Sequence, residues 1–394
     1  MPGIRPTVGE ARSADATGQV ISAHCYRPVS SQYPENPLGN APSFLSGVIA
    51  VSETDRQVHS AAQVTVPGGP VHLAPVQPRE PGPGEVRLDV RAFGICGADA
   101  GMAANPTPAY GFPITPGHEV AGVVAEVGEG VAGWRVGERA GVGWFGGSCG
   151  RCTACRSGDV VHCAERQIPG LTYPGGWATT ITVPAAALVR IPDGLSFEEA
   201  APFGCAGVTT FNALRHSGAE PGELVAVLGI GGLGHFALQF AAAAGFETVA
   251  IGRGEDKRHT ALDLGAHHYI DASAEDAGKA LRALGGARLV LSTASSSKPL
   301  AGLIDGLTPH GRLTVVGFDG TPLDLPLDKL VMHARHVTGH VTGSPVDTEQ
   351  AMRFALASGV RPQVQTAPLK QAAEALKTQQ AGQARFRMVL TTDG

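Results

Sequence analysis

Four cysteines between positions 149 and 163 constrain this chain more than any other feature of its sequence. They follow one another as C-x2-C-x2-C-x7-C, in a stretch rich in glycine and charge: Cys149, Cys152, Cys155 and Cys163. Thiols spaced so closely have little structural use besides holding a tetrahedral metal ion. We therefore predict a closed, structural zinc site in this loop.

Length and composition restrict the remaining possibilities. With 394 residues, 43% of them hydrophobic, the chain is long enough for about two or three domains that each have a core. The formal net charge of -5 shows no basic excess, so we expect neither nucleic acid nor a membrane as a partner. No apolar run reaches the roughly 18 residues that a membrane helix needs. Cysteines spaced for metal ligation favour a reducing, cytoplasmic setting.

The first part of the chain differs in character from the rest. Residues 1–60 are polar and lack helical or alternating apolar periodicity, so we expect this N-terminal extension to be disordered. The apolar run at 44–51 is interrupted and has no basic segment directly before it, which makes it a poor signal peptide. We interpret Cys25 as an incidental thiol. One hypothesis is that translation starts at Val51, which N-terminal sequencing of the native protein would test.

Residues 61–206 are predicted to form a β-rich domain. Short segments rich in valine and separated by Pro and Gly predict strands joined by tight turns, at 64–66, 71–74 and 85–95. Cys96 directly follows the third segment. His118 lies in the turn Pro116-Gly117-His118-Glu119, ahead of a further predicted strand at 120–127.

Cys96, His118 and Cys205 are candidates for a second metal site. A catalytic zinc needs three protein ligands, and two thiolates with one imidazole are a known set. Each residue also has an ordinary alternative, because Cys205 could be a small buried apolar residue and His118 a hydrogen-bonded turn histidine. The residues alone leave both interpretations open.

Residues 207–340 alternate between apolar strands and helical stretches. A buried strand at 224–228 leads into a G-x-G-x-x-G turn and then a helix that continues to 243; the turn is Gly229-Ile230-Gly231-Gly232-Leu233-Gly234. Further strands are expected at 248–251, 268–270 and 289–291. Such glycines let the backbone approach a pyrophosphate at a helix N-terminus. The pattern therefore predicts a Rossmann fold, a doubly wound parallel sheet that binds a nicotinamide dinucleotide.

The end of the second strand of this domain indicates which dinucleotide binds. NAD-binding domains place an acid there for the ribose hydroxyls, whereas this chain has Gly252, Arg253 and, slightly later, Lys257. Arginine suits a 2′-phosphate, so NADP(H) is favoured over NAD(H). The alternative is that Arg253 stacks on the adenine and NAD(H) still binds.

Several motifs together resemble the zinc-dependent alcohol dehydrogenases of the medium-chain dehydrogenase/reductase superfamily. They are Gly94-Ile95-Cys96 with Asp99, the 116–119 turn, the stretch 127–131 that leads to 136–139, and the cysteine loop. The resemblance extends from about residue 61 to the end of the chain. It implies a GroES-like, β-rich catalytic domain before the Rossmann domain, and a return of residues 341–394, with helices near 347–357 and 369–379, to the catalytic domain.

The resemblance also implies roles for individual residues. Cys96, His118 and Cys205 would be the catalytic zinc ligands, Glu119 a carboxylate able to approach the metal, and Asp99 the partner that orients His118. The implied cofactor contacts are the glycine turn itself, Thr209 and Thr293 beside the nicotinamide, and Arg387 at a phosphate. For Arg387 a surface ion pair at a strand edge is an equal alternative.

Two positions depart from the family pattern. Members usually carry Ser or Thr, and often His, where this chain has Ala98 and Gly101, so the usual proton relay is missing. Either ordered water replaces it or the substrate is unusual. Gly97 likewise stands where some members have a basic residue. Trp144 matches a tryptophan that lines the substrate pocket in one branch of the family, although a core aromatic residue is an equal alternative.

These observations predict an enzyme with two zinc ions per chain. The expected reaction is reversible hydride transfer between a primary alcohol or aldehyde and NADP(H), in a homodimer or homotetramer. The alternatives are an NAD(H)-dependent specialised reductase of a biosynthetic pathway, and a zinc- and cofactor-binding protein with little turnover.

Overall fold

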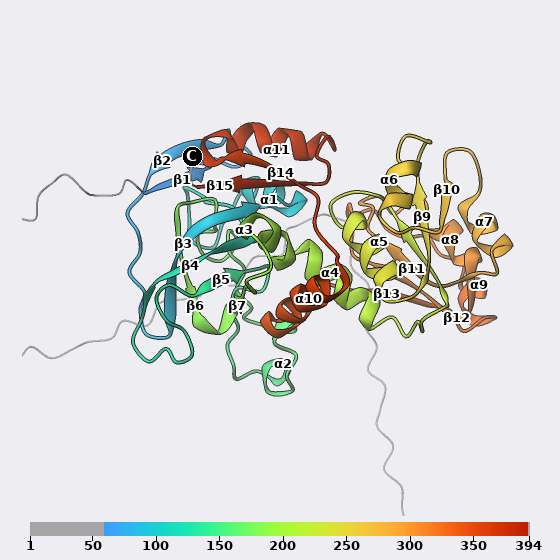
Figure 1. Cartoon of the computed structure of the whole chain (residues 1–394), viewed down its shortest axis with the longest axis horizontal. Coiled ribbons are helices and arrows are strands. Elements are labelled where there is room, and N and C mark those ends of the chain that lie inside the picture. The colour runs from blue at the N-terminus through green and yellow to red at the C-terminus, as the bar shows by residue number, and fades with distance from the viewer. Residues whose placement is uncertain (1–58, 393–394) are drawn as a thin grey trace, which may run out of the picture. The chain divides into compact units, whose positions relative to one another are not determined.

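The computed structural model describes residues 59–392. The expectations for Cys25, for Val51 and for disorder before residue 59 lie outside this range, and Ser60 already belongs to the first strand. Two large sheets organise the described residues, as the labels in Figure 1 show. Among residues 59–392, no helix has both the length and the apolar character needed to cross a membrane.

The first large sheet has seven strands and is mostly antiparallel. Six strands follow the order β14-β15-β3-β4-β5-β7, and β6 pairs with β3 beside this path. The long strand β3 alternates buried residues such as Val86, Leu88 and Val90 with less buried ones, as a strand with one face on a core requires. A separate antiparallel pair precedes it. The bounds of these strands are β1 Ser60–Gln63, β2 His72–Pro75, β3 Glu85–Gly94, β4 Val120–Val127, β5 Arg139–Val142, β6 Thr180–Pro184 and β7 Leu188–Arg190.

The end of the chain returns to this sheet. β15 (Arg387–Thr391) pairs antiparallel with β3, which sets Val389 opposite Gly94, and parallel with β14 (Val364–Pro368). The red strands therefore lie beside the blue β3 in Figure 1. α11 (Ala372–Gln380) buries Leu376 in the same core cluster as Leu390 of β15.

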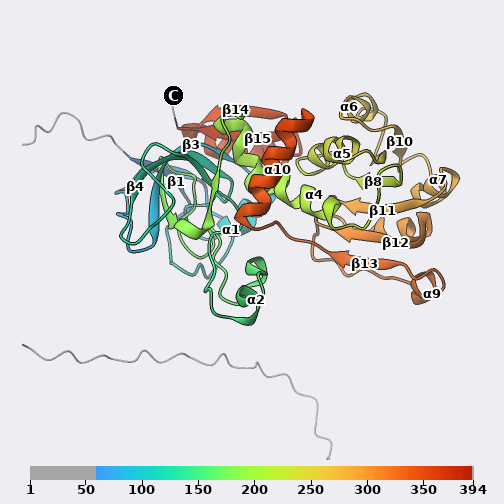
Figure 2. The same cartoon turned by 60° about the horizontal axis from the view of Figure 1, so that its bottom comes forward.

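The second large sheet has six parallel strands in the order β10-β9-β8-β11-β12-β13. The chain moves outward in one direction from β8 to β10 and then in the other from β11 to β13, so the order reverses between β8 and β11. In such sheets, dinucleotides bind where the strand order reverses. Figure 2 shows β8, β11, β12 and β13 in succession, with β13 at the lower edge. The bounds are β8 Leu224–Leu228, β9 Glu247–Gly252, β10 His268–Asp271, β11 Ala287–Ser292, β12 Leu307–Val315 and β13 His336–Gly339.

Helices connect the strands and join the two sheets. One buried cluster contains residues of both sheets and of the helices between them. Within it, the ring of Phe203 packs against that of Phe236 in α5, with ring centroids 5.1 Å apart. The α-helices are α1 Gly97–Ala103, α2 Thr153–Arg156, α3 Phe197–Ala200, α4 Ala206–Arg215, α5 Gly234–Ala243, α6 Arg258–Asp263, α7 Ala277–Ala283, α8 Leu300–Leu303, α9 Leu327–Val331 and α10 Pro345–Ser358, besides α11.

Both predicted sheets are present, but some predicted boundaries were wrong. The strand predicted at 64–66 is only a single bridge from Val64 to Ile114, because the turn around Gly68 ends the extended chain. The regular strand β1 lies just before it. The helix predicted at 369–379 starts as a 3-10 turn, Leu369–Gln371, before α11 begins. The strand at Leu224–Leu228 and the helix after the glycine turn lie where the sequence predicted them.

Candidate active site and metal centres

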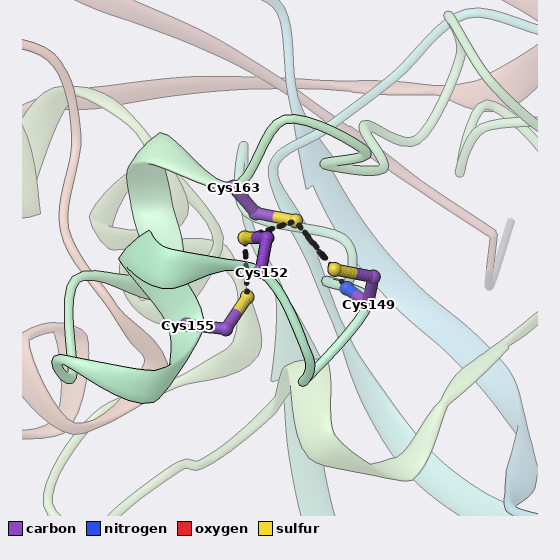
Figure 3. Close-up of side chains that lie close together, drawn as sticks. All are labelled: Cys149, Cys152, Cys155 and Cys163. Carbon is purple, nitrogen blue, oxygen red and sulfur yellow. Dashed lines mark hydrogen bonds between the residues drawn. The ribbon is translucent and has the colours of Figure 1, made fainter.

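The four cysteines of the loop at 149–163 converge as predicted. Their sulfur atoms all lie within 4.8 Å of one another (Figure 3). The Sγ atoms are 3.5 Å apart for Cys152 and Cys155, 3.5 Å for Cys149 and Cys163, and 3.9 Å for Cys152 and Cys163. A tetrahedral site with Zn–S bonds of about 2.3 Å has S–S edges of about 3.8 Å. The sulfurs are therefore spaced for a zinc ion, and none of the four is in a disulfide.

Backbone N–H groups of the loop contact some of these sulfurs and change their pKa values. The backbone N–H groups of Cys149 and Glu165 both donate to Cys163 Sγ at 3.3 Å. N–H groups of Cys155 and Ala164 lower the pKa of Cys152 to about 6, because they stabilise its thiolate. Metal binding requires deprotonated thiols, and the segment favours the ionised form at Cys152. At Cys163 the N–H bonds are outweighed by burial and the neighbouring thiols, which raise its pKa to about 11.

A second cluster is assembled from distant parts of the chain. One ligand atom each from Cys96, His118, Glu119 and Cys205 lies within 4.8 Å of the others. Cys96 stands between β3 and α1, His118 and Glu119 directly precede β4, and Cys205 directly precedes α4. His118 and Glu119 are fully buried, in contrast to the partly exposed cysteine loop.

Two glycines allow these segments to approach each other. The N–H of Gly94 in β3 donates to the Glu119 carbonyl at 2.8 Å, and a Cβ on Gly94 would lie 2.0 Å from Glu119 Oε2. Gly117 adopts a φ of +110°, and a Cβ there would lie 2.4 Å from the Trp177 ring. Both positions therefore need glycine to bring His118 beside Cys96.

Asp99 fixes the orientation of the histidine. Its Oδ1 lies 3.0 Å from His118 Nδ1, and its Oδ2 accepts a hydrogen bond from the Cys96 N–H at 2.8 Å. By hydrogen-bond geometry neither ring nitrogen of His118 has a partner in the described chain, and Nδ1 differs from the buried Nε2 in its 3.0 Å charge contact with Asp99. A carboxylate at one ring nitrogen leaves the other to bind a metal. The buried Nε2, with two thiols nearby, therefore fits the donor set of an open zinc site.

Glu119 and Arg387 form a buried ion pair next to this cluster. The Arg387 guanidinium donates to both carboxylate oxygens of Glu119, and both side chains are at most 4% exposed. Burial raises the pKa of Glu119 to about 7, while the positive charge of Arg387 opposes that shift. The alternative of a surface ion pair for Arg387 is wrong, since its partner and its own side chain are buried.

Arg387 also connects the cluster with the glycine turn. A Cβ on Gly232 would lie 2.7 Å from Arg387 Nη1, so the guanidinium lies directly against that turn. Gly229 has a φ of +92°, and a Cβ on Gly234 would lie 1.9 Å from the Gly229 carbonyl oxygen. Leu233 starts α5. The turn is thus closed tightly on itself, as a phosphate-binding glycine turn must be.

The two predicted nicotinamide-side threonines lie on different elements: Thr209 in α4, and Thr293 directly after β11. Thr293 Oγ1 donates to the Leu228 carbonyl at 2.9 Å and to the Gly229 carbonyl at 3.1 Å, which ties the end of β11 to the glycine turn. Thr209 is buried on α4, one turn after Cys205, whose carbonyl accepts the Thr209 N–H. The structure therefore places Thr293 at the turn and Thr209 near the metal cluster.

Trp144 lies beside the histidine. The Trp144 ring meets His118 edge to face, with ring centroids 4.9 Å apart, and is not fully buried. This position beside the cluster favours the pocket-lining interpretation over a core aromatic residue. A Cβ on Gly101 would meet nothing within 4 Å, so no described side chain fills the place of the usual relay histidine.

Gln379 is a neighbour that the sequence analysis missed. Its Nε2 lies 3.6 Å from where a Cβ on Gly97 would be, and its Oε1 is buried without a partner. No local motif announces this residue, because it reaches Gly97 from α11 at the other end of the chain. Only the fold brings the two together.

Arg253 and Lys257 lie at the end of β9. The Arg253 side chain is exposed and has no hydrogen bond or ion pair to residues 59–392. Arg258, by contrast, pairs with Glu255. Arg253 therefore has no partner among the described residues, and its contact with a cofactor phosphate stays a prediction.

Comparisons with known proteins agree with this geometry. Residues 82–193 match the family model for the alcohol dehydrogenase GroES-like domain, and residues 232–357 match that for zinc-binding dehydrogenases. The chain is 40% identical over 326 residues to the alcohol dehydrogenase notN of Aspergillus sp. (strain MF297-2), covering 83% of this chain and 96% of that protein.

Solved structures are similar over the same region. A cinnamyl alcohol dehydrogenase from Sorghum bicolor superposes with a TM-score of 0.78 at 30% identity, covering 85% of this chain and 98% of that one. A CAD from Helicobacter pylori, complexed with NADP(H), gives 0.76 at 26% identity, with 84% and 97% covered. The chain therefore belongs to the zinc-dependent alcohol dehydrogenases of the medium-chain dehydrogenase/reductase superfamily.

Proposed function

We propose that this alcohol dehydrogenase interconverts primary alcohols and aldehydes with NADP(H) as its cofactor. The observation that carries the proposal is the buried Nε2 of His118, which has no partner in the described chain and lies with Cys96 and Cys205 near a nucleotide-binding turn. Arg387 lies between the ligand cluster and the glycine turn, since it contacts both Glu119 and Gly232.

In this proposal the chain holds two zinc ions with different roles. Cys96, His118 and Cys205 hold the catalytic ion and leave a fourth position for the substrate oxygen; the closed set is Cys149, Cys152, Cys155 and Cys163. When bound in the open site, zinc supplies Lewis acidity towards the substrate oxygen.

The remaining work falls to residues around the open site. Asp99 holds the imidazole ring so that Nε2 faces the metal position. Trp144 limits the space next to His118 and favours small or flat substrates. Thr209 and Thr293 border the nicotinamide, and Arg387 binds a cofactor phosphate from its position against Gly232. Together they place the reacting carbon against the cofactor in a site that excludes bulk water.

No described side chain relays the substrate proton through Ala98 or Gly101, so in this proposal water carries it. Gly101 itself is exposed, and a Cβ there would meet no atom within 4 Å. A specialised pathway reductase, with NAD(H) in place of NADP(H), is the second candidate, and the missing relay is what favours it. Retention of the complete ligand set argues against a binding protein with little turnover.

The preference for NADP(H) rests on the end of β9. Arg253 is exposed and unpaired among the described residues, Lys257 follows it, and Gly252 offers no carboxylate to repel a 2′-phosphate. The similar structure from Helicobacter pylori is a complex with NADP(H). We expect Arg253→Ala to raise the KM for NADPH by about tenfold with little change for NADH. Lys279→Ala, an exposed lysine on α7, is the matched control.

Turnover of a substrate panel tests the reaction itself. Primary aromatic and aliphatic alcohols and aldehydes, with secondary alcohols for comparison, are assayed with each nicotinamide cofactor. The proposal predicts faster turnover of the primary compounds and a higher kcat/KM with NADP(H). A preference for secondary alcohols or for NAD(H) would refute the corresponding part of the proposal.

The enzyme is further proposed to act as a homodimer or homotetramer in the cytoplasm. Among residues 59–392, the edge strand β13 pairs only with β12. The preceding helix α9 and the residue after it expose Val331 (75%) and Met332 (76%), an apolar surface that a second copy would cover. A monomer in light scattering would refute this assembly. The unpaired cysteines of both clusters support a reducing compartment.

A further inference from the structure

The cofactor-specificity turn after β9 is packed against a tyrosine of the neighbouring strand. β9 and β10 pair in parallel, with Asp271 opposite Gly252. Tyr269 of β10, two residues before Asp271, is only 7% exposed. A Cβ on Gly252 would lie 2.3 Å from the Tyr269 hydroxyl oxygen and 3.0 Å from its Cζ atom. The hydroxyl therefore occupies the space into which any side chain at position 252 would extend.

Tyr269 and Asp271 also hold the backbone on the far side of Arg253. The Tyr269 hydroxyl donates to the Gly254 carbonyl at 2.5 Å, and Asp271 Oδ1 accepts the Gly254 N–H at 2.7 Å. Asp271 itself is fixed by the N–H and the hydroxyl of Ser273, at 2.9 and 2.6 Å. Both polar backbone groups of Gly254 are thus held by β10 and the residues that follow it.

The ring of Tyr269 also contacts an arginine. The Arg258 guanidinium lies 4.8 Å from the ring centroid and is paired with Glu255. Cation–π contact and burial keep the ring from swinging away. A side chain introduced at position 252 would have to displace the hydroxyl against these contacts.

We propose that Tyr269 is a positioning residue that sets the nucleotide selectivity of this enzyme. Its hydroxyl occupies the place of the ribose-binding carboxylate that NAD-specific sites use, and with Asp271 it fixes the backbone next to Arg253. The proposal rests on the proposed binding of a nicotinamide nucleotide between the glycine turn and the end of β9. It implies that an acid at position 252 cannot by itself create an NAD site.

Four zinc-loaded, full-length proteins test this coupling by calorimetric titration with 2′,5′-ADP and 5′-ADP. They are the wild type, Gly252→Asp, Tyr269→Val and the double variant; valine keeps a strand-forming residue in β10. We expect Gly252→Asp to weaken both ligands, because its carboxylate meets the tyrosine hydroxyl. The double variant should bind 5′-ADP about tenfold more tightly than Gly252→Asp, since the space is then open. Gly252→Asp that binds 5′-ADP as tightly as the double variant would overturn the proposal.

A conservative variant separates the hydroxyl from the ring. Tyr269→Phe keeps the packing but loses the bond to Gly254, so we expect its preference for 2′,5′-ADP over 5′-ADP to fall several-fold while its unfolding temperature stays close to that of the wild type. Tyr110→Phe, which removes a hydroxyl that donates to the Thr115 carbonyl between α1 and β4, is the control and should leave the preference unchanged. An unchanged preference in Tyr269→Phe would also contradict the proposal.

The same titrations distinguish failure of this inference from failure of the proposed function. A wild type that binds neither nucleotide refutes both. A wild type that prefers 5′-ADP refutes the preference for NADP(H), and refutes with it the selectivity assigned to Tyr269. A wild type that prefers 2′,5′-ADP, together with a Gly252→Asp variant that gains 5′-ADP without any change at Tyr269, refutes the role of Tyr269 alone.

Discussion

The two cysteine-containing clusters use the same kinds of atoms in opposite surroundings. In the loop at 149–163, four sulfurs come from one short segment that is partly exposed. The inner cluster takes its ligands from three separate segments: Cys96, His118 and Cys205. Cys96 and His118 are buried and Cys205 is partly buried. The neighbouring carboxylate of Glu119 is paired with Arg387. The first arrangement needs only one loop to fold, whereas the second needs segments that are far apart in the chain to be brought together.

The difference in ligand number matches the difference in role. Four thiolates complete a tetrahedron and leave no position for a substrate, so the loop can only stabilise. Two thiolates and one imidazole leave one position open, beside a nucleotide-binding turn. The comparison therefore predicts that damage to one cluster affects stability and damage to the other affects turnover.

The largest expected effect is the loss of activity in Cys205→Ala. We expect one zinc ion per chain to be lost and turnover to fall by at least about a thousandfold, because Lewis acidity contributes several kcal/mol to the transition state. The unfolding temperature should change little. Zinc analysis, steady-state kinetics and thermal unfolding measure the three quantities. Cys25→Ser, a cysteine outside both clusters, is the control and should behave like the wild type.

The converse variant is Cys155→Ala in the loop. It should lose the other zinc ion and lower the free energy of unfolding by several kcal/mol, since a structural zinc site contributes its binding energy to folding. At a temperature where the variant is folded, its kcat should stay within a few-fold of the wild type. A variant with normal stability and no turnover would reverse the roles assigned to the two clusters.

A smaller effect is expected when the orientation of His118 is disturbed. Asp99→Ala removes the carboxylate 3.0 Å from His118 Nδ1, and loss of such a partner typically costs about 10- to 100-fold in metal affinity or activity. Asp99→Asn keeps an oxygen able to accept the Cys96 N–H and should retain part of the activity. Zinc affinity measured by competition with a chelator decides the matter; equal affinities in Asp99→Ala and the wild type would show that the carboxylate is dispensable.

The smallest predicted effect concerns acid stability near the glycine turn. Burial lowers the pKa of His235 to about 3, whereas an unfolded histidine titrates near 6.5. The folded state thus binds fewer protons below pH 6.5, and stability falls as the pH drops towards 3. At pH 5 the buried His235 lowers the free energy of unfolding by about 2 kcal/mol, and we expect His235→Phe to be spared this decrease. Denaturant unfolding at pH 8 and pH 5 tests this, with the exposed His259→Phe as control.

The sequence predicted what is encoded locally. The cysteine loop and the G-x-G-x-x-G turn after an apolar strand are recognisable because a few neighbouring residues carry the whole signal. The parallel sheet followed from the strands that alternate with helices beyond Leu224. Cys96, His118 and Cys205 could be proposed as one site from their residue types, but only the family resemblance favoured that interpretation, because nothing in their spacing brings them together.

Other features arise only from contacts between distant segments. Gln379 reaches Gly97 from α11, and Tyr269 fills the space over Gly252 from the next strand. Arg387 was expected at a cofactor phosphate, but its buried pair with Glu119 was not foreseen. In each case the partner lies on another strand or helix, so the sequence carries no periodic or motif-like signal for the contact.

Stepwise removal of zinc from the wild-type enzyme tests whether one cluster serves turnover and the other serves stability. A chelator is titrated while zinc release, turnover and the unfolding temperature are followed in the same sample. We predict two zinc ions per chain. Turnover should fall as one ion is released, and the unfolding temperature should fall as the other is released. A single zinc ion per chain, or turnover and stability lost together with one ion, would contradict it.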